Sequence, residues 1–158
     1  NTGVNLHDLG FGNGFLDMTP KAQATKEIID NLNFAYPEQV INYSSSEIII
    51  NSDVALLRLL FKNLIENAIK YGNNNPVNII LEKGKKIKVI IEDFGLGISK
   101  EALPHIFERF YREDEARNRE IKSYGLGLSI VKEIIVLLNI DIQIESQLGK
   151  GTKITLLF

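Results

Sequence analysis

Two asparagines and a lysine share one face of a predicted helix near the middle of the chain. Asn63, Asn67 and Lys70 are spaced i, i+4 and i+7, which places their side chains in one row. A carboxamide oxygen can join the coordination shell of Mg²⁺, which also keeps water and phosphate oxygens, and an ammonium can neutralise phosphate charge. A solvated helix face with a Glu66–Lys70 pair has the same spacing, and this segment alone favours that second interpretation.

An aspartate followed by two spaced glycines comes directly after a predicted strand, in the sequence DFGLGI at 93–98. A carboxylate at a strand end can accept a hydrogen bond from the exocyclic amine of a purine. The glycines behind it let the backbone approach a flat ring closely. An Asp/Gly turn that binds nothing is the alternative, because turns favour the same residues.

Glycines also open a second predicted helix, in the sequence GLGL at 125–128. The unpaired N–H groups at a helix N-terminus form a ready site for phosphate. The segment is no dinucleotide fingerprint, because Ile130 stands at the third glycine position, and the chain has no GxxxxGK[ST] loop. A nucleotide would therefore be held by another scheme.

Aromatic and charged residues alternate in the sequence FERFYR at 107–112. Arg109 and Arg112 could face phosphates, because the guanidinium fork matches phosphate oxygens. Aromatic anchoring of a loop explains the pattern equally well, so both interpretations stay open.

The elements that must position these residues follow from hydrophobic periodicity and turn signals. The strongest helix signal covers 53–71, with Asp53 as its cap, and a second helix covers 126–138. A further helix is expected to begin at Thr19 and Pro20, after a short edge strand at 15–18. Strands are predicted over 39–44, 47–51, 77–82, 87–92, 140–146 and 152–158. This order predicts an α+β fold, a two-layer α/β sandwich whose mixed, mostly antiparallel sheet has its helices on one face.

Length and composition exclude several classes of protein. The 158 residues suit one domain, which we place at 15–158 after a flexible arm at 1–14. A net charge of -2 gives no electrostatic case for binding nucleic acid or an anionic membrane. There is no cysteine, which excludes disulfides and thiolate chemistry, and no apolar run reaches the length of a membrane span.

Taken together and in order, five segments resemble the sequence boxes of histidine-kinase catalytic domains. The likeness runs from about residue 15 to residue 158, and its segments are NLIENAIKY at 63–71, DFGLGI at 93–98, FERFYR at 107–112, GLGL at 125–128 and GKGT at 149–152. The resemblance implies the Bergerat ATP-binding fold, with ATP and Mg²⁺ as cofactors. Its usual extra glycines before GLGL are replaced here by Lys122, Ser123 and Tyr124.

The resemblance also implies a role for each matching residue. It makes Asn67 the Mg²⁺ ligand, Asp93 the reader of adenine, Tyr71 a wall near the base or ribose, and Thr152 part of the pocket floor. The residues implied on the phosphate side are Asn63, Lys70, Arg109 and Arg112, with the arginines reaching either the phosphates or a partner domain. The other implied nucleotide contacts are Gly95, Gly97, Ile98, Gly125, Leu126, Gly127 and Leu128, next to a mobile lid at 113–124.

One position separates relatives within this fold. Members that hydrolyse ATP typically carry a glutamate four residues before the metal-binding asparagine, and here that position is Asn63. An amide cannot act as a general base near neutral pH, so transfer to a group other than water is expected. The alternatives are an ATPase or anti-sigma-factor serine kinase of the same fold, and a pseudokinase whose pocket serves as an interaction module.

The resemblance further implies an acceptor histidine on a separate dimerisation domain that is absent from this chain. His7 is followed by Gly10 and Gly12 in a stretch that is a poor helix, and His105 is expected to be structural or close to the lid. The implied partners are that dimerisation domain and, indirectly, a response regulator. The parent protein is expected to be dimeric and anchored in the inner membrane, with this domain in the cytoplasm.

Overall fold

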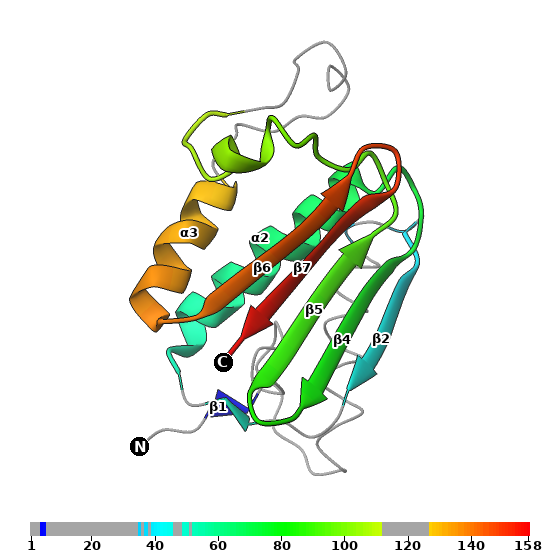
Figure 1. The fold of residues 1–158 in the computed structure, drawn as a ribbon. Coiled ribbons are helices and arrows are strands. Elements are labelled where there is room, and N and C mark those ends of the chain that lie inside the picture. Colours follow the sequence, from blue (N-terminus) through cyan, green and yellow to red (C-terminus); the bar gives the residue numbers. More distant parts are fainter. Residues whose placement is uncertain are drawn as a thin grey trace.

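A five-stranded sheet in the order β2-β4-β5-β7-β6 forms the centre of the molecule (Figure 1). It is seen in a computed structural model that describes residues 4–5, 35, 37, 39–45, 49–50, 52–111 and 127–158. Strands β2 and β4 run parallel and the other neighbours run antiparallel, as the sequence predicted. The strands are β2 (Ile41–Ser45), β4 (Val77–Lys83), β5 (Ile87–Asp93), β6 (Asp141–Gln147) and β7 (Gly151–Leu157).

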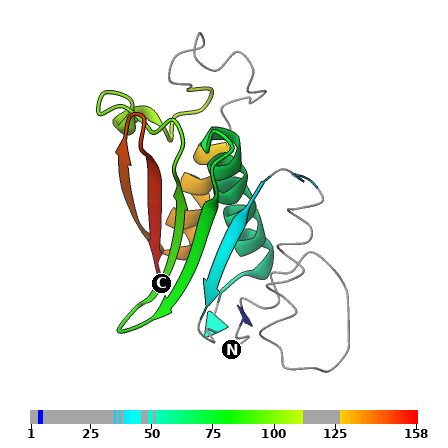
Figure 2. The ribbon, with the colours of Figure 1, turned by 90° about the vertical axis from the view of Figure 1, so that its right-hand side faces the viewer.

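Two helices cover one face of this sheet, which confirms the predicted two-layer sandwich (Figures 1 and 2). They are α2 (Val54–Tyr71) and α3 (Gly127–Leu138). Helix α2 begins where Asp53 caps it, because the Asp53 carboxylate accepts the backbone N–H of Leu56 at 2.9 Å.

The core lies between the helices and the sheet. Leu57, Leu60 and Leu64 of α2 are fully buried, as their helical spacing predicted. They meet β-branched residues from alternate positions of β4 and β5, the pattern of a half-buried strand. The buried apolar residues contributed by these two strands, all but Leu81 β-branched, are Val77, Ile79, Leu81, Val89 and Ile91.

The described parts of the N-terminal region add a second, two-stranded sheet. Strand β1 (Val4–Asn5) pairs antiparallel with β3 (Ile49–Ile50). The predicted arm at 1–14 therefore contains a short paired strand. The edge strand expected at 15–18 and the start of the helix expected at Thr19 lie outside the described residues.

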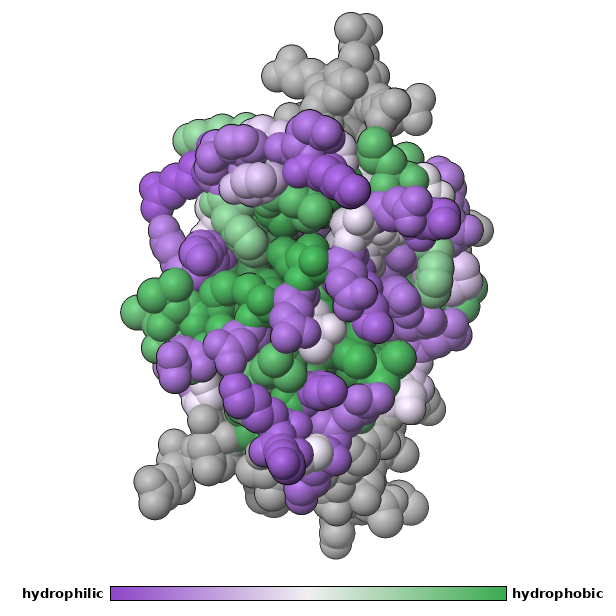
Figure 3. Space-filling model, viewed as in Figure 1, coloured by the Kyte–Doolittle hydropathy of each residue, from purple (hydrophilic) through white to green (hydrophobic). Residues whose placement is uncertain are grey.

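No helix of the described residues covers the other face of the sheet, and Figure 3 shows that face with apolar and polar side chains interleaved. Half-buried Ile80 and Ile90 pair across β4 and β5 on this open face, and Glu82 pairs with Lys88. Among the described residues, none of the helices is both long and apolar enough to cross a membrane.

Candidate functional site

The polar row of α2 faces the beginning of α3. A methyl group built on Gly127, the first residue of α3, would lie 3.2 Å from Asn63 Oδ1 and 3.7 Å from Asn67 Nδ2. Glycine thus lets the two amides lie close to the helix N-terminus, where backbone N–H groups are unpaired by the helix itself. Two predicted site residues and Gly127 therefore lie at one place, and half-buried Lys70 follows Asn67 by three residues on the same helix.

The orientation of the Asn63 amide is set by its own helix. Its Nδ2 donates a hydrogen bond of 2.8 Å to the carbonyl oxygen of Leu59, one turn earlier. The amide oxygen is therefore turned toward Gly127 and keeps its acceptor capacity. Among the described residues, no group of three His, Cys, Asp or Glu could hold a metal ion. A cation at this place would therefore rely on amide oxygens together with water and phosphate oxygens, a donor set that Mg²⁺ accepts.

The second predicted component, Asp93, lies at the end of β5 and is only 7% exposed. Its Oδ1 accepts the backbone N–H of Gly95 at 3.0 Å. Burial raises the pKa of the Asp93 carboxyl above its ordinary value, and hydrogen bonds from the backbone of Gly95 and Thr152 oppose that rise. A buried carboxylate with two backbone donors is a fixed hydrogen-bond acceptor, which suits a ligand that carries an N–H group.

The glycine loop after Asp93 packs against the end of α2. The backbone N–H of Leu96 donates to the carbonyl oxygen of Tyr71 at 3.0 Å. A side chain on Gly95 would overlap that same carbonyl oxygen, so the close approach requires glycine. Half-buried Tyr71 lies one turn after Asn67, and the loop therefore joins the carboxylate of β5 to the amide row of α2.

The turn between β6 and β7 closes the other side of the loop. Gly97 has a φ of 67°, and a side chain there would overlap the carbonyl oxygen of Gln147. Gly151 has a φ of 108° and lies against the carbonyl group of Asp93. Both positions need glycine because of the left-handed backbone and the close contact. Thr152 follows directly and pairs with Asp93 across β5 and β7.

Residues 107–111 of the segment FERFYR lie after the short helix η2 (Leu103–His105), above one end of α3 (Figure 1). Arg109 Nη2 forms an ion pair of 2.7 Å with Glu133 Oε1 of α3, and both side chains are exposed. Arg109 is therefore brought to the outer side of α3. His105 Nδ1 lies 2.7 Å from Glu108 Oε1, and its ring lies 5.5 Å from that of Tyr111.

Of the remaining predicted site residues, Leu128 and Ile98 lie in the described part of the chain and the others do not. Leu128 is half-buried and packs against the core, and the backbone N–H of Ile98 donates to Ser146 Oγ at 2.8 Å. The predictions that lie outside the described residues concern Arg112, the lid at 113–124 with Lys122, Ser123 and Tyr124, Gly125, Leu126 and His7.

Two residues that tie the site together were missed at the sequence level. Asn75 Nδ2 donates to the carbonyl oxygens of Gly72 and Phe94, at 3.1 and 2.8 Å, and so joins the end of α2 to the glycine loop. Ser146 contacts both the glycine loop and the β6–β7 turn. The signal for Ser146 was a polar residue at an inward position of β6, where Ile142 and Ile144 precede it.

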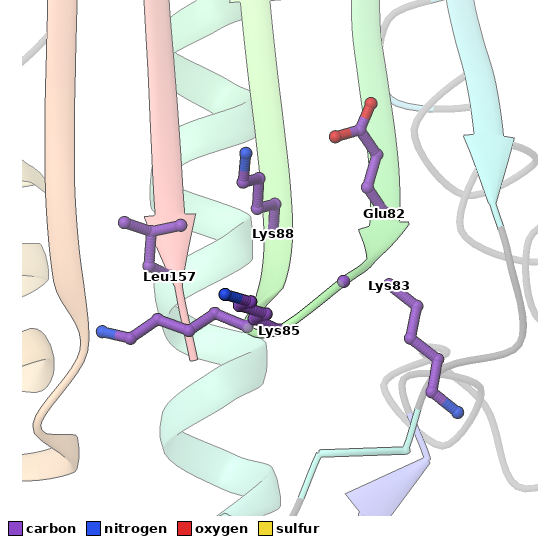
Figure 4. A pocket seen from close by; sticks show the side chains of 7 residues that line it. Glu82, Lys83, Lys85, Lys88 and Leu157 are labelled. Carbon is purple, nitrogen blue, oxygen red and sulfur yellow. The ribbon is translucent and has the colours of Figure 1, made fainter.

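A separate hollow lies at the opposite end of β5, around the β4–β5 turn (Figure 4). Lys88 and Asp93 are five residues apart on one strand, which separates them by roughly 17 Å. The hollow is lined by Glu82, Lys83, Gly84, Lys85, Lys86, Lys88 and Leu157. It contains none of the residues predicted for the site.

The sequence profile of the histidine kinase-, DNA gyrase B-, and HSP90-like ATPases matches residues 52–158. The chain belongs to this ATPase family. Sensor histidine kinase YkoH of Bacillus subtilis is 34% identical over 138 residues, which cover 86% of this chain and 30% of YkoH. This chain thus spans less than a third of the length of that relative.

Solved structures give the same fold. The mycobacterial sensor histidine kinase MprB superposes with a TM-score of 0.77 at 18% identity, covering 99% of this chain and 95% of that one. The catalytic domain of histidine kinase ThkA gives a TM-score of 0.72 at 20% identity, covering 99% and 95%. The chain thus has the fold of histidine-kinase catalytic domains, and the family resemblance drawn from the five segments is confirmed.

Proposed function

We propose that this chain binds ATP with Mg²⁺ and passes the γ-phosphoryl group to a histidine on a separate dimerisation domain. The observation that supports this most directly is the close approach of Gly127 to the amides of Asn63 and Asn67. That approach brings together a helix N-terminus, which attracts phosphate, and amide oxygens that suit Mg²⁺. In this proposal Asn67 is the protein ligand of the ion, which supplies charge neutralisation at the phosphates.

The other proposed site residues contact either the base or the phosphates of the nucleotide. Asp93 accepts a hydrogen bond from the exocyclic amine of the base, and Tyr71 and Thr152 lie beside it. Lys70 neutralises phosphate charge, and Arg109 acts on the phosphate side if it leaves Glu133, its partner here. Such positioning and charge neutralisation are what phosphoryl transfer asks of a protein.

The identity of residue 63 supports a transfer to another group in preference to water. The Asn63 amide has its N–H bound to Leu59 and its oxygen toward Gly127, so nothing on this side chain can take a proton from water. Slow hydrolysis of ATP by the isolated chain is therefore expected.

The parent protein and its partners follow from the relatives. Because YkoH is named a sensor histidine kinase and is much longer than this chain, the rest of the parent is proposed to hold the dimerisation domain. A response regulator would receive the phosphoryl group next. In this proposal the parent is dimeric and anchored in the inner membrane, with this domain in the cytoplasm.

Binding of a non-hydrolysable ATP analogue with and without Mg²⁺ tests the site. The unsubstituted 158-residue chain should bind in a Mg²⁺-dependent manner. The double variant Asp93→Ala, Asn67→Ala should not bind. The matched control is Asn78→Ala, which removes an asparagine that bonds Asn42 between β4 and β2 and should bind normally. Tight binding by the double variant would contradict the site.

Labelling with γ-³²P-ATP tests the reaction. A separately supplied histidine-containing dimerisation domain should become labelled, and the chain alone should not. Rapid steady hydrolysis, or labelling of a serine on a partner, would instead favour the ATPase or serine-kinase alternative. A chain that binds no nucleotide would favour the pseudokinase.

A further inference from the structure

We propose that Ser146, which lies outside all five motif segments, is a positioning residue that holds the base end of the site and orients the Thr152 hydroxyl. Its Oγ lies 2.8 Å from the Ile98 backbone N–H, 3.0 Å from the Gly151 carbonyl oxygen and 2.8 Å from Thr152 Oγ1. One side chain therefore contacts the glycine loop, the β6–β7 turn and the residue at the pocket floor. The part of this proposal that concerns nucleotide rests on the proposed function.

The three contacts fix the direction of each hydrogen bond. A serine hydroxyl has one proton and two acceptor lone pairs. The Gly151 carbonyl can only accept, so the Ser146 proton goes to it, and the Ile98 N–H can only donate, so Ser146 accepts from it. The assignment that satisfies all three contacts therefore has Thr152 donating its hydroxyl proton to Ser146.

This direction determines what Thr152 offers to a ligand. Because its proton is used by Ser146, Thr152 Oγ1 has only lone pairs left. Ser146 pairs with Thr152 across β6 and β7, and Thr152 pairs with Asp93 across β7 and β5, so the three residues form one row on the helix side of the sheet. Asp93 and Thr152 together then form a floor of acceptors. Such a floor favours a base with an exocyclic amine, as in adenine, and disfavours an exocyclic carbonyl, as in hypoxanthine.

The same side chain also ties two loops together. The Ile98 N–H is the last backbone donor of the glycine loop, and Gly151 begins β7 against the carbonyl of Asp93. Without the Ser146 hydroxyl, the part-buried Ile98 N–H would lose its partner, which opens the loop more readily. The hydroxyl thus acts on both the shape and the hydrogen-bond pattern of the base end.

The variant Ser146→Ala tests both roles in the 158-residue chain. The amide exchange rate of Ile98, measured by NMR without nucleotide, should rise about tenfold because its acceptor is gone. The Kd for ATP, measured by calorimetry, should rise about tenfold, which corresponds to about 1.4 kcal/mol. The preference for ATP over inosine triphosphate should fall at least about threefold, because the Thr152 proton becomes free to meet a carbonyl.

Three further variants separate this role from a general loss of fold. Ser146→Thr keeps the hydroxyl and should retain the nucleotide preference and the slow Ile98 exchange. Thr152→Val removes the second hydroxyl at constant shape, so it should lower the preference for ATP while leaving Ile98 protected by Ser146. Ser44→Ala, at an exposed position of β2, is the matched control and should change none of these values.

The outcomes distinguish this proposal from the function itself. An unsubstituted chain that binds no ATP would refute the proposed function. The Ile98 exchange rate of Ser146→Ala would still decide whether Ser146 holds the glycine loop. Unchanged Ile98 exchange and an unchanged ratio of the two Kd values in Ser146→Ala would overturn the proposal. Should Ser146→Ala fail to fold, a Thr152→Val chain with an unchanged ratio would overturn the orienting role.

Discussion

Replacement of Gly127 by alanine should abolish nucleotide binding without unfolding the domain. The added methyl group would lie 3.2 Å from Asn63 Oδ1 and 3.7 and 3.8 Å from the amide atoms of Asn67. Only the first contact is tight, and Asn63 can relieve it by moving a few tenths of an ångström. The methyl group would nevertheless occupy the space in which phosphate and Mg²⁺ are proposed to bind.

The expected changes in Kd and in melting temperature have separate causes. Mg²⁺ sits about 2.1 Å from its oxygen ligands. The new methyl carbon, 3.8 Å from Oδ1 of Asn67, the proposed ligand, would leave little room for the ion on that side. Losing one or two charge-assisted hydrogen bonds to phosphate costs about 1.5–3 kcal/mol each, which raises Kd by at least about tenfold. Alanine is the better helix former by at most about 1 kcal/mol, so the melting temperature should change by no more than about 4 °C.

Calorimetry with a Mg²⁺–ATP analogue and thermal melting followed by circular dichroism measure both effects on the same sample. The matched control is Gly84→Ala at the β4–β5 turn, where the new methyl group would make an ordinary contact, 3.6 Å from the carbonyl oxygen of Lys86. That variant should bind as the parent does. A Gly127→Ala chain that binds within about twofold of the parent would refute the placement of phosphate at α3.

Four further predictions concern Asp93, the core and the cap of α2. Burial raises the pKa of Asp93 above 3.8. On acidification, nucleotide affinity should therefore begin to fall at a higher pH than it would with an exposed aspartate. The affinity of Asp93→Asn should be low and independent of pH in that range. Because its pKa is raised on folding, Asp93 takes up a proton more readily in the folded state than in the unfolded state. The unfolding free energy of the nucleotide-free chain should therefore fall as pH rises from 3.8 through the raised pKa. Urea melts at several pH values measure this fall, and Asp93→Asn should lack it. Leu64→Ala removes a fully buried side chain and should cost about 2–5 kcal/mol in a urea melt, whereas Leu59→Ala, 40% exposed on the same helix, should cost much less. Asp53→Ala removes the cap of α2 and should cost about 1 kcal/mol, with a smaller loss in Asp53→Asn because asparagine also caps helices; equal losses would contradict the capping role.

The sequence alone was sufficient for the local structure and for the identity of the family. The 3.6-residue period of Leu57, Leu60 and Leu64 placed the buried side of α2, and the same period put half-buried Asn63 and Asn67 along the edge of that side. The two-residue alternation in β4 and β5 likewise separated the inward from the outward residues. Such patterns predict burial because the residues that face the core recur at a fixed spacing within a single helix or strand.

Only the tertiary structure decided which of these local features meet. Gly127 comes 60 or more residues after the amides that it faces, and no local period specifies which helices lie side by side. Asn75 and Ser146 were missed for the same reason, since a polar residue in a turn or strand shows its partners only when the strands are ordered. That order, β5-β7-β6, creates the row of Asp93, Thr152 and Ser146. The residue types are therefore fixed by the sequence, but their roles depend on the neighbours that the sheet brings to them.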